Sequence, residues 1–157
     1  MNIERDEHIK IRDASFSLLA EGKTLKVRAE GYSMFPSIKP GAVILIEPIP
    51  EGSFPSPGEI VAWKRESGFV VHRLIRIHRD GEKAIFITRG DSCAYEDKPV
   101  NPDQVAGRVI KVESVNGREI SSGDNLIRKP SYLYNRLMVW GLIIYKRIKE
   151  IFLRKMF

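Results

Sequence analysis

The stretch EIVAWKRESGFVVHRLIRIHRDGEKAIFIT, residues 59–88, decides the fold of this chain. It contains three short apolar runs, EIVAW, FVVHRLIRI and AIFIT, and charged or glycine residues separate them. Runs of this length, rich in β-branched and aromatic residues, predict β-strands. Asp80-Gly81, between the second and third runs, is a strong signal for a hairpin turn.

The same pattern continues on both sides of this stretch. Further apolar runs are LKVRA from Leu25, AVILIEPI from Ala42 and VAGRVIKVESV from Val105. Asn116-Gly117 predicts a second hairpin. Many short strands at close spacing are typical of sandwiches and barrels. We therefore predict a mainly β fold, a compact β-sandwich or barrel-like domain, over residues 25–122.

Helical periodicity flanks this domain. In the N-terminal segment 1–24, residues 5–21 mix apolar and charged side chains before Gly22, which favours an amphipathic helix with a glycine cap. From Ser131 onward, apolar residues recur every three to four positions, so residues 131–157 predict a basic amphipathic helix. Its apolar arc consists of Leu133, Leu137, Trp140, Ile144, Ile148 and Ile151, and its cations are Arg136, Lys146, Arg147, Lys149, Arg154 and Lys155.

Three environments suit this apolar arc. It can pack on its own β domain, as most amphipathic helices do. It can lie in the plane of an anionic membrane surface, which Trp140, Tyr145 and the cationic face favour. It can also pair with a partner helix. The apolar stretch 137–145 would span only roughly 13 Å as a helix, so we expect it not to cross a bilayer.

Composition narrows the class of protein. The chain has 157 residues, enough for one domain, and a net charge of +6 that suits an anionic partner. Cys93 is the single cysteine, and the three histidines lack the spacing of metal ligands, so we expect no cofactor or metal. The charged N-terminus shows no apolar export signal. We expect a cytoplasmic or peripheral membrane location, with the side of the membrane left open.

Ser33 and His72 have the residue types of a nucleophile and its base. Ser33 lies in GYSMFPSIKPG, where a strand enters a turn, and a serine needs a base within hydrogen-bond reach to attack a carbonyl. His72 lies in the apolar run VVHRLI, and a histidine can accept and return a proton near neutral pH. Taken singly, each has a structural explanation, as a turn serine and as a buried strand histidine.

A carboxylate that orients the histidine would complete such a site. The segment TRGDSCAYED, residues 88–97, follows a strand and contains Asp91 and Asp97. The residues alone leave open whether either acid serves His72, because Gly-Asp also forms ordinary turns.

Taken in order, GYSMFPSIKPG, PGEIVAWK, VVHRLIRI and ITRGDSCAYED resemble the signal peptidase I and repressor-cleavage superfamily of serine peptidases. The resemblance covers about residues 25–113 and implies the β catalytic fold of that superfamily. The family's Ser-Met-x-Pro box falls on Ser33–Pro36, and its Gly-Asp-Ile-Val strand falls on Gly58–Val61, with Glu59 in place of the aspartate. Its general-base strand falls on Val70–Ile75, and its Gly-Asp-Asn box falls on Gly90–Ser92.

Position 72 indicates the branch of this superfamily. Bacterial signal peptidases and self-cleaving repressors have a lysine there, whereas the endoplasmic-reticulum, archaeal and spore-former type has histidine followed by arginine, as in His72-Arg73. That branch uses an aspartate six residues after the Gly-Asp aspartate, which here is Asp97. The resemblance thus implies Ser33 as nucleophile, His72 as general base and Asp97 as its orienting acid, with Asp91 as a structural or alternative acid.

The resemblance implies a serine endopeptidase that removes a leader or signal peptide from a polypeptide substrate. Gly31 departs from the bacterial pattern, which has a hydroxyl residue there, so the oxyanion would depend on the Ser33 N–H. Self-cleavage fits less well, because the one Ala-Gly pair, Ala106-Gly107, lies downstream. The alternative is a non-catalytic β domain that binds nucleic acid or a membrane surface. No aromatic stacking motif is present, so we do not expect nucleic acid.

Overall fold

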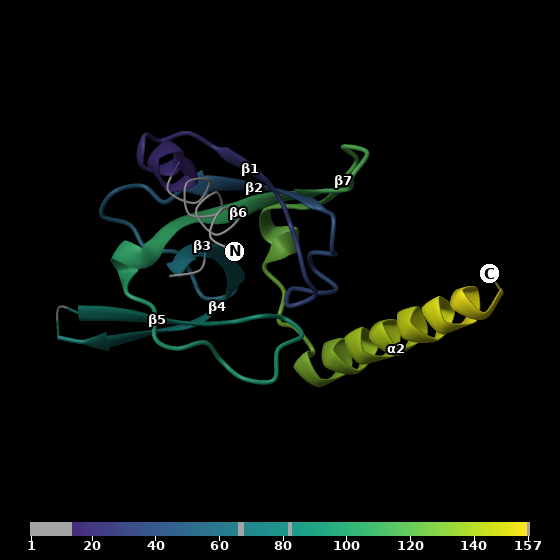
Figure 1. The fold of residues 1–157 in the computed structure, drawn as a ribbon. Helices are drawn as coiled ribbons and strands as arrows, with labels where there is room; N and C mark the ends of the chain where they lie inside the picture. Colours follow the sequence, from purple (N-terminus) through teal and green to yellow (C-terminus); the bar gives the residue numbers. More distant parts are fainter. Residues whose placement is uncertain (1–13, 66–67, 82, 157) are drawn as a thin grey trace, which may run out of the picture.

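The computed structural model describes residues 14–65, 68–81 and 83–156, and it is mainly β, which confirms the predicted fold class (Figure 1). Helices flank the strands on both sides along the chain. The strands are β1 Leu25–Arg28, β2 Val43–Pro48, β3 Ile60–Arg65, β4 Gly68–Asp80, β5 Lys83–Arg89, β6 Val105–Glu113 and β7 Glu119–Ser122. The helices are a short segment at 14–20, the 3₁₀ turns η1 Pro102–Gln104 and η2 Gly123–Leu126, and α2 Tyr132–Met156.

The strands form one antiparallel sheet in the order β1-β2-β6-β3-β4-β5, with β7 paired to β6. Both hairpins predicted from the sequence are present. Gly81 follows β4 with φ +58°, and Gly117 lies between β6 and β7 with φ +76°, a backbone region in which glycine carries no steric cost. The sheet thus places β3, β4 and β5 side by side, and these strands carry most of the residues discussed below.

Strand β4 puts neighbouring residues on opposite faces of the sheet, since side chains alternate along a strand. His72 pairs with Val61 of β3, and Arg73 pairs with Ile60 of β3 and Arg89 of β5. Two adjacent polar side chains therefore leave the sheet in opposite directions, and both lie in its buried central part.

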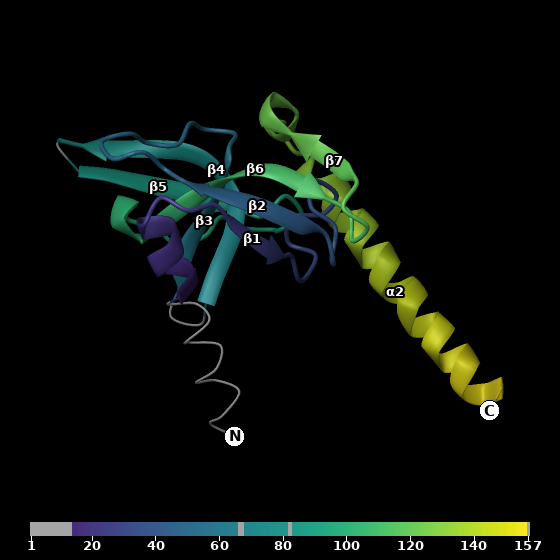
Figure 2. The same cartoon turned by 90° about the horizontal axis from the view of Figure 1, so that it is seen from above.

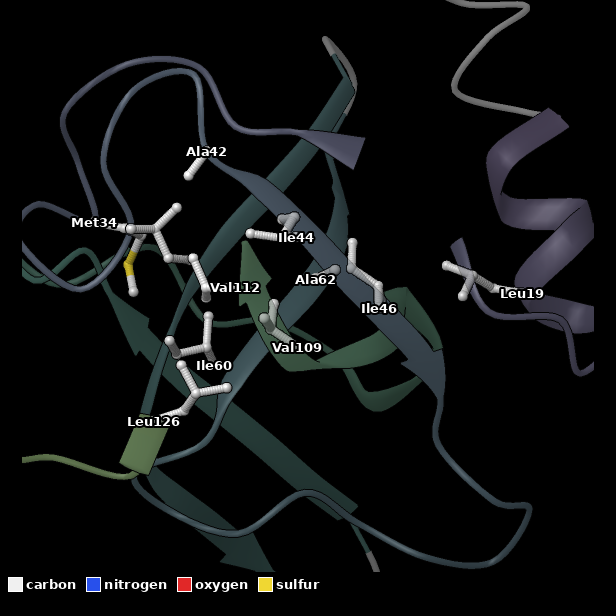
Figure 3. Packing of buried hydrophobic residues seen from close by; sticks show 11 residues of the cluster. Leu19, Met34, Ala42, Ile44, Ile46, Ile60, Ala62, Val109, Val112 and Leu126 are labelled. Carbon is white, nitrogen blue, oxygen red and sulfur yellow. The ribbon is translucent and has the colours of Figure 1, made fainter. Parts of the chain in front are cut away.

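Two apolar clusters hold the sheet together. The larger contains Ile44, Ile60 and Val112 from the sheet, together with Met34 from the loop between β1 and β2 (Figure 3). The smaller contains residues from β3, β4 and β5 with Val100. Burial of one such side chain contributes about 1.5–3 kcal/mol. Because Met34 is part of the larger cluster, the core also anchors the loop that carries Ser33.

The short helix at 14–20 lies within the segment predicted to be helical, and residues 5–13 lie outside the described residues. Gly22 ends it with φ +80°, and the amides of Gly22 and Lys23 donate to the carbonyls of Leu19 and Leu18. This is the glycine cap expected from the sequence.

Helix α2 confirms the predicted C-terminal helix, and Figures 1 and 2 both show it projecting away from the sheet. Its predicted apolar arc is 41–68% exposed. The structure therefore contradicts the alternative in which this arc packs on the β domain. No helix in the described parts of the chain has an apolar segment long enough to span a membrane.

Candidate active site

The loop between β1 and β2 positions Ser33. Its two ends are joined to each other, since the Ala29 amide donates to the Ala42 carbonyl at 2.7 Å. Within the loop, Met34 is 5% and Ile38 3% exposed, and both belong to the larger core cluster. The serine itself is only partly exposed. The Ser-Met-Phe-Pro box is thus a loop fixed by its apolar side chains next to a partly accessible hydroxyl.

The segment after β5 lies directly against this loop. The Ser92 amide donates to the Ser33 carbonyl at 2.9 Å, and the Ser92 hydroxyl donates to the Tyr32 carbonyl at 2.6 Å. A side chain at Gly90 would place its Cβ 2.7 Å from the Ser33 carbonyl oxygen and 3.0 Å from His72 Nε2. The first separation is too short for a Cβ against a backbone atom and the second is tight, so a glycine is required where the two segments meet.

His72 is held by Asp97. The Nδ1 atom of His72 lies 2.6 Å from Oδ2 of Asp97, and since a carboxylate oxygen accepts, we assign the proton to Nδ1. The Thr88 hydroxyl donates to the same carboxylate at 2.7 Å, and the Asp97 amide donates to the Thr88 carbonyl at 2.8 Å. With Nδ1 used in this way, Nε2 is the remaining ring nitrogen, and it lies beside Gly90, which also adjoins the Ser33 carbonyl.

Asp91 has a different set of partners. Its carboxylate accepts from Nε and Nη2 of Arg73 at 2.8 and 2.7 Å, and from the Ser37 hydroxyl. Arg73 also donates to the carbonyls of Gly58 and Leu126. The two side chains are 2% and 0% exposed. Asp91 is therefore engaged on the opposite side of β4 from His72.

The structure leaves one predicted contact open. Among the described residues, no hydrogen bond joins the Ser33 hydroxyl to His72, so this contact stays a prediction. Nucleophile–base hydrogen bonds are often long in a free enzyme and shorten when substrate binds. Among the same described residues, the Ser33 amide donates no hydrogen bond. It is therefore free to donate to an oxyanion.

Other residues, which the sequence did not point to, hold the segment 88–97 that carries Asp91 and Asp97, called the acidic segment below. Thr88 and Ser37 contact the two acids, and Asn135 of α2, 5% exposed, donates to the Asp91 carbonyl at 3.0 Å. Arg89 donates to the carbonyls of the 93–94 turn and stacks 3.6 Å from the Tyr132 ring. Thr88 ends a predicted strand beside Gly-Asp, which was a usable signal. Asn135 had no such signal in the sequence, because single polar residues are common on helices.

Cys93 also lies at this site, but its chemistry does not suit a nucleophile. Burial raises the pKa of its thiol, and the charge of Asp97 raises it further, so the thiol stays protonated at neutral pH. Within the described residues, no group of three or more His, Cys, Asp or Glu side chains is placed to hold a metal ion.

Comparison with known proteins assigns the chain to a family of peptidases. A family model described as Peptidase S24-like matches residues 2–110, and the chain belongs to this family. The chain is also similar to signal peptidase I W of Bacillus subtilis (strain 168), with 31% identity over 86 residues, which cover 54% of this chain and 45% of that protein. The chain thus aligns with less than half of that relative. The superfamily inferred from the sequence motifs is confirmed, and the Ser–His–Asp branch stays a prediction.

Proposed function

We propose that this chain is a serine endopeptidase that removes a leader or signal peptide from a polypeptide substrate, with Ser33 as nucleophile, His72 as general base and Asp97 as the acid that orients it. The observation that carries the proposal is the 2.6 Å contact between His72 Nδ1 and Asp97. It gives the imidazole a defined tautomer and leaves Nε2 as the basic nitrogen beside the Ser33 loop.

The chemical steps follow from these positions. His72 Nε2 takes the proton of the Ser33 hydroxyl as its oxygen attacks the peptide carbonyl, and the Ser33 amide stabilises the resulting oxyanion. The imidazolium, stabilised by Asp97, then gives its proton to the leaving amine, and the carbon–nitrogen bond breaks. A water molecule, activated by the same nitrogen, releases the acyl group and restores the serine.

The substrate class has its own support. The relative in Bacillus subtilis is named a signal peptidase, and the family is one of peptidases. The nucleophile loop adjoins a helix with an exposed apolar arc, a setting compatible with apolar leader peptides. Cleavage of a leader from another polypeptide is therefore the activity we assign.

The test compares wild type with Ser33→Ala and with Ser53→Ala, a control serine that is exposed and distant in sequence. Wild type and Ser53→Ala should react with a serine-directed fluorophosphonate probe and create new N-termini in a membrane and peptide extract, detected by mass spectrometry. Ser33→Ala should lose labelling and cleave on the order of 10⁶-fold more slowly. Equal cleavage by Ser33→Ala and wild type would show that Ser33 is not the nucleophile, and a folded wild type that neither reacts nor cleaves would favour the non-catalytic alternative.

A further inference from the structure

Helix α2 exposes an apolar strip that no described part of the chain covers. Trp140, Leu133 and Leu137 are 68%, 62% and 58% exposed, and the rest of the arc continues the strip along the helix. The neighbouring Tyr134 and Tyr145 are 61% and 65% exposed. A contiguous apolar surface of this kind marks an interaction site.

The orientation of α2 directs this strip away from the β domain. Asn135 donates to the Asp91 carbonyl, and Lys146 donates to the Tyr32 hydroxyl and lies 5.2 Å from its ring. Val139 and Leu142, partly buried, fall in the same row of the helix, because positions three to four apart share one face. The domain thus holds the helix by this row. The apolar arc lies on the other side, because its residues fall about half a turn of the helix away from that row. Figure 2 shows that the helix itself projects from the sheet.

The charges on α2 indicate what covers the strip. Arg136 and Arg147 lie beside the arc, and the only acidic residue in the sequence of α2 is Glu150. A second copy of the helix would bring these like charges together, which disfavours pairing. An anionic surface would attract them while the arc enters the apolar layer.

The aromatic residues favour the same occupant. Trp140 and Tyr145 combine an apolar ring with a polar atom, and such side chains are enriched where lipid meets water. A helix with these residues beside its arc and cations on its flank has the composition of interfacial membrane helices.

We propose that α2 docks on an anionic lipid membrane surface, lying in its plane with the arc of Leu133, Leu137, Trp140, Ile144, Ile148 and Ile151 buried among the lipids. Because Lys146 contacts Tyr32 and Asn135 contacts Asp91 on the opposite face of the helix, docking holds the Ser33 loop one helix diameter, roughly 10 Å, from the lipid surface. Peptide cleavage plays no part in this binding, so the two proposals can fail separately.

The experiment measures binding of the full chain to vesicles of phosphatidylcholine alone and of phosphatidylcholine mixed with phosphatidylglycerol. Co-sedimentation should occur with the anionic vesicles, weaken with salt and be weak with neutral ones. The chain has two tryptophans, and Trp63 is 7% exposed whereas Trp140 is 68% exposed. A blue shift of emission on binding therefore reports Trp140, and Trp140→Phe should bind without the shift.

Matched variants locate the surface. Ile144→Glu should weaken binding to the anionic vesicles roughly tenfold or more, as should Arg147→Glu. Val115→Glu introduces the same charge at an exposed apolar residue of the β6–β7 turn, 62% exposed, and should bind like wild type. Circular dichroism and urea unfolding check that each variant is folded.

Three outcomes would overturn the proposal. They are unchanged vesicle binding by Ile144→Glu, equal binding of wild type to neutral and anionic vesicles, and a dimer in light scattering that Ile144→Glu dissociates while vesicle binding is absent. The last would assign the strip to a second copy of the chain.

Discussion

Two adjacent residues of β4 each pair with an aspartate from the same short segment, yet the two pairs differ in surroundings. Arg73 and Asp91 are 2% and 0% exposed, whereas His72 and Asp97 are 11% and 21% exposed. Arg73 uses its guanidinium on the Asp91 carboxylate and on two backbone carbonyls. His72 keeps one ring nitrogen free of Asp97 and beside Gly90.

The two pairs contain similar residue types, but one suits a structural role and the other suits the proposed chemical role. A buried ion pair stabilises a fold only when hydrogen bonds satisfy both charges, and the Arg73–Asp91 pair meets this condition. A general base needs a ring nitrogen that its orienting partner leaves free, and Nε2 of His72 is free of Asp97. The four predictions below test this division, from the largest expected effect to the smallest.

Asp97→Asn should abolish most activity and leave the fold nearly unchanged. The amide can donate to Nδ1 and stabilise the wrong tautomer of His72, and in serine proteases this change costs on the order of 10⁴-fold in kcat. Peptide cleavage and urea unfolding measure the two effects. Asp103→Asn, at an exposed acid of η1, serves as the control. Full activity in Asp97→Asn would show that the enzyme works as a bare Ser–His pair.

Asp91→Ala should destabilise the protein by about 3–5 kcal/mol, because it leaves the Arg73 charge buried without a partner. Chemical denaturation measures the free energy of unfolding. The double variant Arg73→Met with Asp91→Leu removes both charges and should be more stable than Asp91→Ala. Wild-type stability of Asp91→Ala, combined with loss of cleavage, would instead place Asp91 in the catalytic machinery.

Asn135→Ala should cost about 1–3 kcal/mol, since it leaves the buried Asp91 carbonyl without its donor. Asn125→Ala, at an exposed residue of η2, is the matched control and should change stability little. Denaturation midpoints compare the two variants. Equal midpoints would mean that α2 contributes nothing to the acidic segment.

Glu96→Gln should have the smallest effect, and one that depends on pH. A hydrogen bond from Arg76 lowers the pKa of Glu96 below its ordinary value of 4.5. Because the folded pKa is the lower one, this ion pair stabilises the fold above that value, and the stabilisation disappears as the pH falls through the folded pKa. The midpoints of wild type and variant should differ slightly at neutral pH and converge in acid. A difference that grows in acid would contradict this.

The sequence predicted the strands well because apolar runs and glycine turns are local signals. Ser33, His72 and Asp97 were also singled out, the last through a family resemblance. The residues alone left Asp91 and Asp97 as alternatives, because the choice depends on which face of β4 each acid meets. The sequence could not predict whether the apolar arc of α2 faces the β domain or solvent, because the amphipathic pattern is the same in both cases. Contacts of Asn135 and Lys146 decide it.

Met34, the residue after Ser33, belongs to the larger core cluster. Ser33 is therefore bonded directly to a buried core residue, and Met34 can become exposed only when the core unfolds. We expect the Ile38 amide, which donates to the Met34 carbonyl at 2.9 Å, to exchange with deuterium at the rate of whole-molecule opening rather than of loop motion. In that case, the Ser33 loop does not unfold separately from the core, and any change that loosens the core also disorders the position of the Ser33 hydroxyl.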